Sequence, residues 1–482
     1  MEQIKLSQHL VLVEADNGYM YAYNSILGGL KKLTNEELDL IKRIQENKEI
    51  ELKKYETEIT NLKKLNFLKT VNDEYELMKP ILKNYRKDVS NGDSITKLLL
   101  YVTGNCMLRC SYCYIDDAHE MEQKETDLNC GTGNMTWEVA KKSIDVFYQI
   151  IMKNKQKKVH IRFHGGEPFL NFNIIKKTIN YVNEKFKDIE VIFHTNTNGI
   201  CVTDEMIDFL VEKSNYGKHS FDLEVSIDGP KDCHDKLRKY PNGTGSFDKG
   251  IETIKRFIDK GFPLNQIDCA ATLNKYNYTR LREFIDVAKK IGLTAVEINT
   301  LIFESEYDFL DKVDDRVECL IDARIYGVEQ GIHVTGKWFK LLERLYKPVL
   351  NYCGRIGQQF AVDLDGNVFL CTGYFRNFGK IEEWEKIIKD NEYINLASRI
   401  VGQMEECKDC PIECLCAGGC PASAESSYGS FYNKESKECE FRTKMVEKLI
   451  KNIDKVSNQK IKLDEVDPSY NPTIERYKEA RK

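Results

Sequence analysis

The chain has 482 residues, of which 41% are hydrophobic and 30% charged, and its formal net charge is −5. A chain this long exceeds one ordinary core, so we expect two or three domains, and its composition is that of a globular rather than a disordered protein. The weak negative charge argues against a nucleic-acid partner. The chain has neither a signal-like start nor a run of roughly 18–20 apolar residues, which predicts a cytoplasmic protein without a membrane partner.

Residues 1–90 form the first predicted domain. The β-rich runs HLVLVEAD and YMYAYNS flank Asn17–Gly18, a pair typical of tight β-hairpins, and GGLKKLT is a candidate third strand. Asn35 is the predicted N-cap of the helical segment NEELDLIKRIQEN, and KKYETEITNLKKLNFL also has helical spacing. We therefore expect a small domain in which a β-hairpin is followed by helices.

Residues 95–330 alternate apolar strands with amphipathic helices. The predicted strands are KLLLYVT, KKVHIRFHG, IEVIFHTNT, DLEVSID, QIDCAATL and AVEINTLI. The predicted helices between them are WEVAKKSIDVFYQIIMK, NIIKKTINYVNEKF, TDEMIDFLVEKS, FDKGIETIKRFIDKG and YTRLREFIDVAKKIG. This alternation predicts an α/β fold with a parallel sheet, either doubly wound or a partial barrel with its chemistry at the carboxyl ends of the strands. The polar stretch Ile115–Asn134 interrupts the pattern, and we expect a surface loop there.

Ten of the sixteen cysteines fall into two closely spaced clusters, and seven of these ten lie within residues 345–460, where apolar periodicity is weak. A disulfide framework would need an oxidising compartment, so the pattern indicates metal binding. We expect residues 345–460 to form a domain stabilised by metal, followed by a charged tail over residues 461–482. Cys130 lies in the predicted surface loop.

The first cysteine cluster, in YVTGNCMLRCSYCYIDD, directly follows a predicted strand. Cys106, Cys110 and Cys113 are spaced C-x3-C-x2-C, so their thiolates can hold one face of a 4Fe–4S cluster and leave the fourth iron open to another ligand. Zinc is the alternative, but structural zinc sites use four ligands, and the triad has no fourth ligand nearby in the sequence.

This spacing, with Tyr112 before the last cysteine, resembles the signature of the radical S-adenosylmethionine (SAM) superfamily, whose fold is a partial (β/α)6 TIM barrel. HGGEP at residues 164–168 is similar to the family's GGEP turn, which contacts the amino group of SAM. Ordinary turn chemistry is the alternative for the segments HTNTNG and SIDGP. The resemblance implies SAM binding by Tyr112, Gly165, Gly166, Glu167, Asn196, Asn198, Ser226, Asp228 and Arg238.

The second cysteine cluster resembles the SPASM domain, which holds two auxiliary iron–sulfur clusters. The resemblance implies an outer cluster on Cys407, Cys410, Cys416 and Cys439 and an inner cluster on Cys353, Cys371 and Cys420. Together with the first triad, this makes three 4Fe–4S clusters. Residues 354–370 contain no cysteine, so we expect an open iron on the inner cluster, with Cys414 or an upstream residue as the alternative ligand. A zinc ribbon is the other interpretation of the C-x2-C pair.

The whole pattern is similar to that of radical SAM/SPASM peptide maturases. This resemblance implies reductive cleavage of SAM to a 5′-deoxyadenosyl radical, with an electron donor such as flavodoxin or ferredoxin. The N-terminal domain resembles the winged-helix-like domain with which such enzymes bind the leader of a ribosomally made precursor peptide as an added β-strand. An open inner cluster suits a thioether crosslink at a precursor cysteine, as made by sactipeptide and ranthipeptide maturases.

Three other functions stay open at this point. One is carbon–carbon crosslinking of a peptide. A second is formylglycine formation by an anaerobic sulfatase-maturating enzyme, for which Glu297 in AVEINTL is a candidate carboxylate. The third is a zinc-stabilised binding module without enzymatic activity. The sequence assigns no catalytic acid or base.

Overall fold

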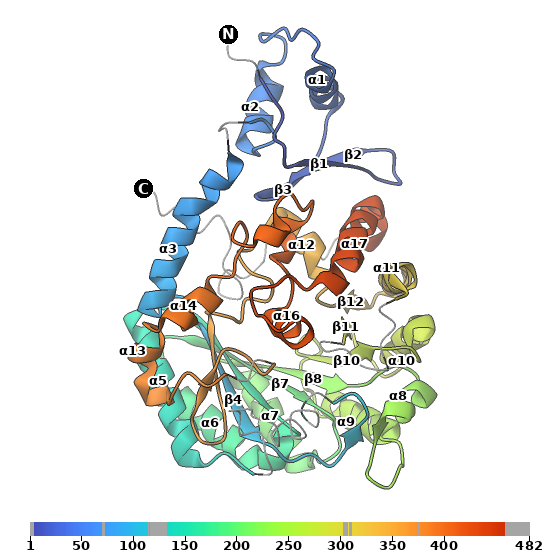
Figure 1. Cartoon of the computed structure of the whole chain (residues 1–482). Helices are drawn as coiled ribbons and strands as arrows, with labels where there is room; N and C mark the ends of the chain where they lie inside the picture. The colour runs from blue at the N-terminus through green and yellow to red at the C-terminus, as the bar shows by residue number, and fades with distance from the viewer. Residues whose placement is uncertain are drawn as a thin grey trace.

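The fold is taken from a computed structural model (Figure 1), which describes residues 4–69, 73–113, 115, 133–301, 307, 311–373 and 376–457. Most of the predicted loop Ile115–Asn134, with Cys130, and the predicted tail 461–482 lie outside the described residues. In the part of the chain that the structure describes, every helix is too short or too polar to cross a bilayer.

The N-terminal region begins with the predicted hairpin. Strands β1 (Leu10–Glu14), β2 (Met20–Asn24) and β3 (Gly28–Lys32) form an antiparallel sheet in that order. Helices α1 (Asn35–Gln45) and α2 (Glu56–Lys64) follow and share a separate apolar core with the sheet, which includes Ala22, Leu40, Ile41, Leu62 and Phe67. The three strands precede the helices, and the winged-helix likeness of this module remains a prediction.

The predicted cap of the first helix is wrong by one residue. The N-cap is Thr34, whose hydroxyl accepts a hydrogen bond from the Glu37 amide, while the Glu37 carboxylate accepts one from the Thr34 amide. This reciprocal arrangement is a capping box, and it satisfies two amides that a helix terminus otherwise leaves unpaired. Asn35 is instead the first helical residue.

Helix α3 (Met78–Asn91) leads from the N-terminal module along one side of the molecule to the barrel (Figure 1). Its buried side chains Ile81, Tyr85 and Val89 belong to the main apolar core rather than to that of the N-terminal module. The helix therefore anchors the N-terminal module to the remainder of the chain.

The central sheet has the strand order β12-β11-β10-β8-β7-β6-β4-β13-β14, and the first seven strands in this order are mutually parallel. All six predicted strands are present: β4 (Lys97–Thr103), β6 (Lys158–Gly165), β7 (Glu190–Thr197), β8 (Ser220–Ser226), β10 (Ile267–Leu273) and β11 (Ala295–Thr300). The sheet adds β12 (His333–Thr335), β13 (Gln359–Val362) and β14 (Val368–Phe369). Parallel strands that follow the chain order without reversal make a singly wound partial barrel, not a doubly wound sheet.

Helices cover the outside of this barrel, and the five predicted ones are all present. Their bounds are α5 (Trp137–Lys153), α6 (Phe172–Lys185), α7 (Asp204–Tyr216), α9 (Phe247–Asp259) and α10 (Leu281–Lys290), with α11 (Val313–Gln330) added after β11. Strand alternation explains the packing: Val159, Ile161 and Phe163 of β6 are fully buried in the main core with the helices. The intervening residues face the lumen of the barrel, and in β6 they are His160, Arg162 and His164.

The C-terminal region consists of short elements that lie between the barrel and the N-terminal module (Figure 1). They are α12 (Lys340–Tyr346), α13 (Trp384–Ile387), α14 (Asn391–Ala397), α15 (Glu413–Cys416), α16 (Pro421–Tyr428), α17 (Cys439–Lys451) and α18 (Ile453–Val456). Its apolar side chains, such as Leu396, Phe441 and Met445, join the main core of the barrel. This region therefore uses the barrel surface to bury apolar area that it could not bury alone.

Candidate functional site

The first cysteine triad lies in the loop that leaves the carboxyl end of β4. Strand β5 (Arg109–Cys110) pairs with β9 (Arg238–Lys239), so that Cys110 stands opposite Arg238. Burial raises the pKa of the Cys110 thiol to about 12; Arg238 lowers it, and the neighbouring thiols of Cys113 and Cys106 raise it. The three thiols are thus close enough to influence one another, and a guanidinium faces them.

The two glycines of the HGGEP turn allow β6 to pack on the backbone in front of this triad. A Cβ atom on Gly165, where φ is 145°, would lie 2.0 Å from the Thr103 carbonyl oxygen, and one on Gly166 would lie 2.5 Å from that of Asn105. The Gly166 amide donates to the Thr103 carbonyl at 3.0 Å. Only glycine fits either position, so the turn holds the cysteine loop in register with β6.

Glu167, the acid of the same turn, is buried and joins the ends of β6 and β7. Its carboxylate accepts hydrogen bonds from the Thr197 hydroxyl and the Asn198 amide, both at 2.7 Å, and from the Phe169 amide at 3.1 Å. Burial raises its pKa to about 7, and these hydrogen bonds oppose the shift. The Asn198 side chain then lies 3.6 Å from the Cys106 sulfur. Glu167 therefore reaches the triad through Asn198, and its assignment as a SAM contact remains a prediction.

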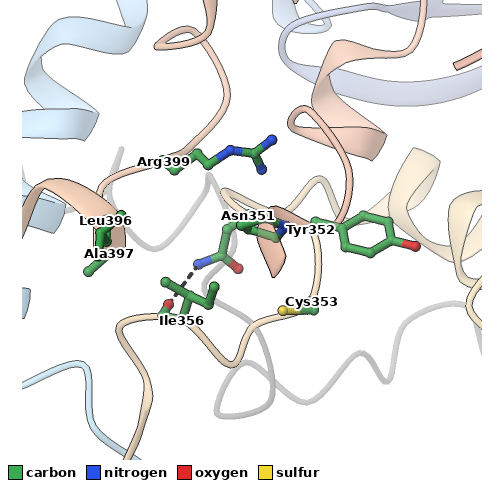
Figure 2. Close-up of a pocket in the computed structure, with 8 residues that line it drawn as sticks. Asn351, Tyr352, Cys353, Ile356, Leu396, Ala397 and Arg399 are labelled. Atoms are coloured by element: carbon green, nitrogen blue, oxygen red, sulfur yellow. Dashed lines mark hydrogen bonds between the residues drawn. The ribbon is translucent and has the colours of Figure 1, made fainter. Parts of the chain in front are cut away.

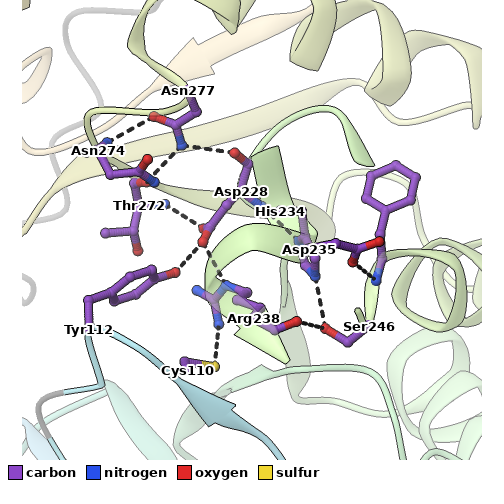
Figure 3. Close-up of polar contacts among 11 residues, drawn as sticks. Cys110, Tyr112, Asp228, His234, Asp235, Arg238, Ser246, Thr272, Asn274 and Asn277 are labelled. Carbon is purple, nitrogen blue, oxygen red and sulfur yellow. Dashed lines mark hydrogen bonds and ion pairs between the residues drawn. The ribbon is translucent and has the colours of Figure 1, made fainter. Parts of the chain in front are cut away.

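Asp228, at the end of β8, is fully buried in a network of protein donors (Figure 3). Tyr112 donates its hydroxyl to the carboxylate, Arg238 Nε donates at 2.9 Å, and the Thr272 amide donates to the other oxygen at 2.9 Å. Arg238 Nη1 lies 4.0 Å from the Cys110 sulfur. Burial holds the pKa of Tyr112 well above its usual range, so it remains a hydrogen donor. Tyr112 and Arg238 are thus oriented toward the cysteine loop by Asp228.

Sequence reasoning missed the outer part of this network. Asn277 donates to the Asp228 carbonyl at 2.8 Å, and His234 lies 3.2 Å from its amide and 2.9 Å from the Ser246 hydroxyl. The sequence does contain one signal for a turn at this place: NKYN, with two asparagines, directly follows the strand QIDCAATL. The other partners come from distant segments.

Asn196 and Ser226, the remaining predicted SAM contacts, lie half-buried at the ends of β7 and β8. The Asn196 side chain accepts a hydrogen bond from Arg162 and donates one to Glu224, and both partners face the lumen. Asn196 therefore connects the rim of the barrel with charged side chains deeper inside.

The lumen below this rim is lined with ionisable groups, of which the sequence analysis named only Glu297, as a candidate carboxylate. Glu224, Asp268 and Glu297 project from three neighbouring strands, and burial, followed by the charges of Glu224, Glu297 and Asp222, raises the pKa of Asp268 well above its usual range. Burial and Glu224 raise the pKa of Asp222 to about 6. The Glu297 carboxylate accepts a hydrogen bond from Asn299 at 2.7 Å. The lumen therefore holds several carboxyl groups that are close enough to raise one another's pKa.

The downstream cysteines form two further groups. Burial, followed by the thiols of Cys420 and Cys353, raises the pKa of Cys371 to about 12, which places these three together. Figure 2 shows Cys353 among the residues that line a small pocket, together with Asn351 and Arg399. Burial and then Cys416, with smaller contributions from Cys410 and Cys439, raise the pKa of Cys407 to about 12. The remaining four cysteines of the motif therefore form the second group.

Cys414 is fully buried, and burial, with a smaller contribution from the Cys410 thiol of the second group, raises its pKa. Its amide donates to the Ser25 carbonyl at 2.7 Å, and its thiol donates to the Asn24 carbonyl at 3.5 Å. Asn24 is the last residue of β2, and Ser25 begins the turn to β3 of the N-terminal module. The thiol therefore anchors that module.

The donor set fits iron–sulfur clusters better than single ions. Zinc would draw four donors to about 2.3 Å from one point, and no group of three or more acidic, histidine or cysteine side chains converges in that way within the described ranges. A cuboidal cluster takes each cysteine on a different iron, so its ligands lie farther apart. None of the fifteen cysteines in the described residues forms a disulfide.

Comparisons with known proteins agree with this geometry. Residues 100–286 match the model of the radical SAM superfamily, and residues 353–411 match that of the SPASM iron–sulfur cluster-binding domain. The chain is 24% identical over 475 residues to the radical SAM cyclopropyl synthase TigE of Paramaledivibacter caminithermalis, covering 93% of this chain and 96% of TigE. It is 25% identical over 359 residues to the cysteine-type anaerobic sulfatase-maturating enzyme of Clostridium novyi, covering 70% and 90% of the two chains.

Two solved structures share the fold. The structure of anSMEcpe with bound SAM superposes with a TM-score of 0.60 at 20% identity, over 75% of this chain and 98% of the other. Streptococcus suis SuiB bound to SAM superposes with a TM-score of 0.52 at 16% identity, over 90% and 99% of the two chains. The two domain matches, together with a cysteine triad at the carboxyl end of the first barrel strand, show a radical SAM domain over residues 100–286 and a SPASM iron–sulfur domain over residues 353–411.

Proposed function

We propose that this protein is a radical SAM enzyme that modifies a ribosomally made precursor peptide. The observation that carries the proposal is the juxtaposition of three parts: the cysteine triad at the barrel rim, the two SPASM cysteine groups, and an N-terminal β-sheet module joined to the SPASM loop through Cys414. Relatives with peptide substrates support it, since SuiB has been solved with its precursor peptide SuiA and anSMEcpe with a peptide.

Three 4Fe–4S clusters are proposed, one on each group of cysteines. When bound at the first triad, the cluster supplies, with SAM and one electron, a 5′-deoxyadenosyl radical that removes a hydrogen atom from the substrate. The chain's own residues would orient SAM: backbone carbonyls of the Gly165–Gly166 turn would accept from its ammonium group, and Arg238, fixed by Asp228, lies near the Cys110 sulfur that would hold the cluster. A donor such as flavodoxin or ferredoxin supplies the electron.

The SPASM groups favour an oxidative crosslink as the outcome. Cys353, Cys371 and Cys420 form a set of three, and Cys414 is held elsewhere by Asn24 and Ser25. A set of three leaves one iron of the inner cluster open. A precursor cysteine could bind there, so we propose a thioether crosslink as the product.

Carbon–carbon bond formation is the second candidate, and one observation favours it. TigE, which aligns with 93% of this chain, is named a cyclopropyl synthase, and a cyclopropyl ring requires a new carbon–carbon bond. Formylglycine formation is the third candidate, because the sulfatase-maturating relatives align with 70% of the chain. The products differ chemically, so a single experiment separates them.

The N-terminal sheet is the proposed site for the leader of the precursor. Its two edge strands are β1 and β3, and an extended peptide can add to such an edge through backbone hydrogen bonds. The exposed side chains of Lys32 and Tyr19 lie on this module, with Lys32 Nζ 3.0 Å from the centre of the Tyr19 ring. Replacing Lys32 and Tyr19 by alanine should therefore weaken peptide binding without preventing cleavage of SAM.

Mass spectrometry of a candidate precursor tests the proposal. The anaerobically reconstituted protein is incubated with SAM, dithionite and short cysteine-containing peptides encoded beside its gene, and the products are alkylated with iodoacetamide. A thioether removes about two hydrogen masses and one alkylatable thiol per crosslink. Loss of hydrogen with all thiols retained indicates carbon–carbon bonding, and loss of sulfur indicates formylglycine. An unchanged peptide, with SAM cleaved, would contradict the assignment of the substrate.

A further inference from the structure

A buried ion pair lies between the two SPASM cysteine groups. Arg442, from α17, pairs with Glu435, and their residues are only 5% and 6% exposed. Arg442 Nη1 lies 3.7 Å from the sulfur of Cys416, a member of the outer group. The Glu435 carboxylate accepts a hydrogen bond at 2.8 Å from the amide of Cys420, a member of the inner group. One ion pair therefore contacts a cysteine of each group.

The space around this pair is closely filled. A Cβ atom on Gly419 would lie 2.2 Å from Arg442 Nη1 and 2.6 Å from Glu435 Oε2, so the pair packs against the loop that joins Cys416 to Cys420. The Arg442 guanidinium also stands 4.9 Å from the ring centre of Tyr352, directly before Cys353. No side chain larger than glycine at position 419 would leave the pair in place.

Two other buried arginines of this region have a different role. Arg399 donates to four carbonyl oxygens, those of residues 417, 418, 419 and 433. Arg344 donates to the carbonyls of Leu415 and Tyr352. These two side chains organise loops. Arg442 instead directs its donors to a cysteine sulfur and a carboxylate, which is the arrangement that alters the electronic properties of a bound cluster.

We propose that Arg442 and Glu435 are positioning residues that set and link the reduction potentials of the two auxiliary clusters. Reduction adds one electron and makes a cluster more negative, so a guanidinium and a hydrogen bond at the Cys416 sulfur stabilise the reduced form and raise its potential. Glu435 carries a negative charge and accepts a hydrogen bond from the Cys420 amide, so it lowers the potential of the inner cluster. The inference rests on cluster binding by the SPASM domain and not on the identity of the peptide.

Because Arg442 and Glu435 carry opposite charges, their replacement should shift the auxiliary-cluster reduction potentials in opposite directions. Arg442→Gln removes the positive charge and should lower an auxiliary-cluster potential, whereas Glu435→Gln removes the negative charge and should raise one. Arg442→Lys keeps the positive charge, so its auxiliary-cluster potential should lie between those of Arg442→Gln and the wild type. Arg316→Gln is the control for iron content after loss of a buried arginine: Arg316 is 1% exposed and pairs with Glu438 of the same segment at 2.7 Å.

The assay is an anaerobic redox titration of the full reconstituted chain, followed by electron paramagnetic resonance, with iron content measured in parallel. Cys106, Cys110 and Cys113 are replaced by alanine throughout, so that only auxiliary clusters contribute. We expect opposite shifts of potential for Arg442→Gln and Glu435→Gln at unchanged iron content. Wild-type potentials in all variants, shifts of the same sign, or equal iron loss from Arg442→Lys and Arg316→Gln would overturn the proposal. If Arg442→Gln loses iron and Arg442→Lys does not, the test uses Arg442→Lys: a potential below that of the wild type supports the proposal, and the wild-type potential overturns it.

Discussion

Replacing Glu167 with glutamine should destabilise the protein whichever way the new amide is oriented. One carboxylate oxygen accepts from the Asn198 amide at 2.7 Å, and the other accepts from the Phe169 amide at 3.1 Å. A glutamine NH₂ group must take one of these two positions, where it faces a backbone N–H that has no other acceptor in its direction. The structure therefore offers no orientation that keeps both hydrogen bonds.

The magnitude follows from the bonds that are lost. A hydrogen bond to a charged group contributes about 1.5–3 kcal/mol, and a buried donor left unpaired costs about 1–3 kcal/mol. The lost hydrogen bond and the unpaired donor are partly the same effect, so their costs are not simply added. We expect Glu167→Gln to lower the free energy of unfolding by about 3 kcal/mol. Asn198, which Glu167 holds near the Cys106 sulfur, should be released as well.

Urea unfolding followed by circular dichroism measures the loss, and hydrogen–deuterium exchange over residues 195–200 tests its location. Glu190→Gln is the matched control, because Glu190 is an exposed glutamate at the start of β7, the strand whose other end contacts Glu167, and it pairs with Lys158 at 3.3 Å. We expect the control to change the free energy of unfolding by less than about 0.5 kcal/mol. If Glu167→Gln stays within that limit and its exchange is unchanged, the proposed role of the carboxylate is refuted.

Three further predictions concern the cysteines, the rim and the lumen. Cys414→Ala should retain the wild-type iron content and Cys420→Ala should lose iron, because the Cys414 thiol points to Asn24; equal iron loss in both would refute this. Tyr112→Phe, which removes one of the donors to Asp228, should slow 5′-deoxyadenosine formation at unchanged iron content, whereas an unchanged rate would show that this hydroxyl is dispensable. The raised pKa of Asp222, about 6, implies that its contribution to stability is present below pH 4 and lost as pH rises to about 6, by about 3 kcal/mol. In Asp222→Asn, the midpoint of urea unfolding should vary less with pH between about 4 and 6 than in the wild type. The same pH dependence in both proteins would contradict this prediction.

The sequence predicted the strands of the barrel well because alternation is a local property. In KVHIRFHG, every second residue is apolar, and these are the residues that pack against helices. The cysteine spacing was equally informative, since it reflects the geometry that a cluster requires. The helix cap was misplaced because Thr34 and Asn35 are both good caps, and only the return bond from Glu37 distinguishes them.

The remainder of the site could not be predicted because it depends on which side chains meet across the barrel. Alternation places Glu224, Asp268 and Glu297 on the inner face, but it does not reveal that three carboxylates influence one another there. Nor does spacing show that Asp228 is saturated by protein donors, since Tyr112 and Thr272 are far away in the sequence. Cys414 lies inside the SPASM motif, yet its partners belong to the first module.

The central claim is that the triad Cys106, Cys110 and Cys113 directs cleavage of SAM. The most direct measurement is chromatographic quantification of 5′-deoxyadenosine after the anaerobic protein is mixed with SAM and dithionite, with iron counted in the same sample. We expect about 12 irons per chain and product formation in the wild type, against about 8 irons and no product when the three cysteines are replaced by alanine. Product formation by that variant at the wild-type rate, or a wild-type protein that binds zinc in place of iron, would contradict the account.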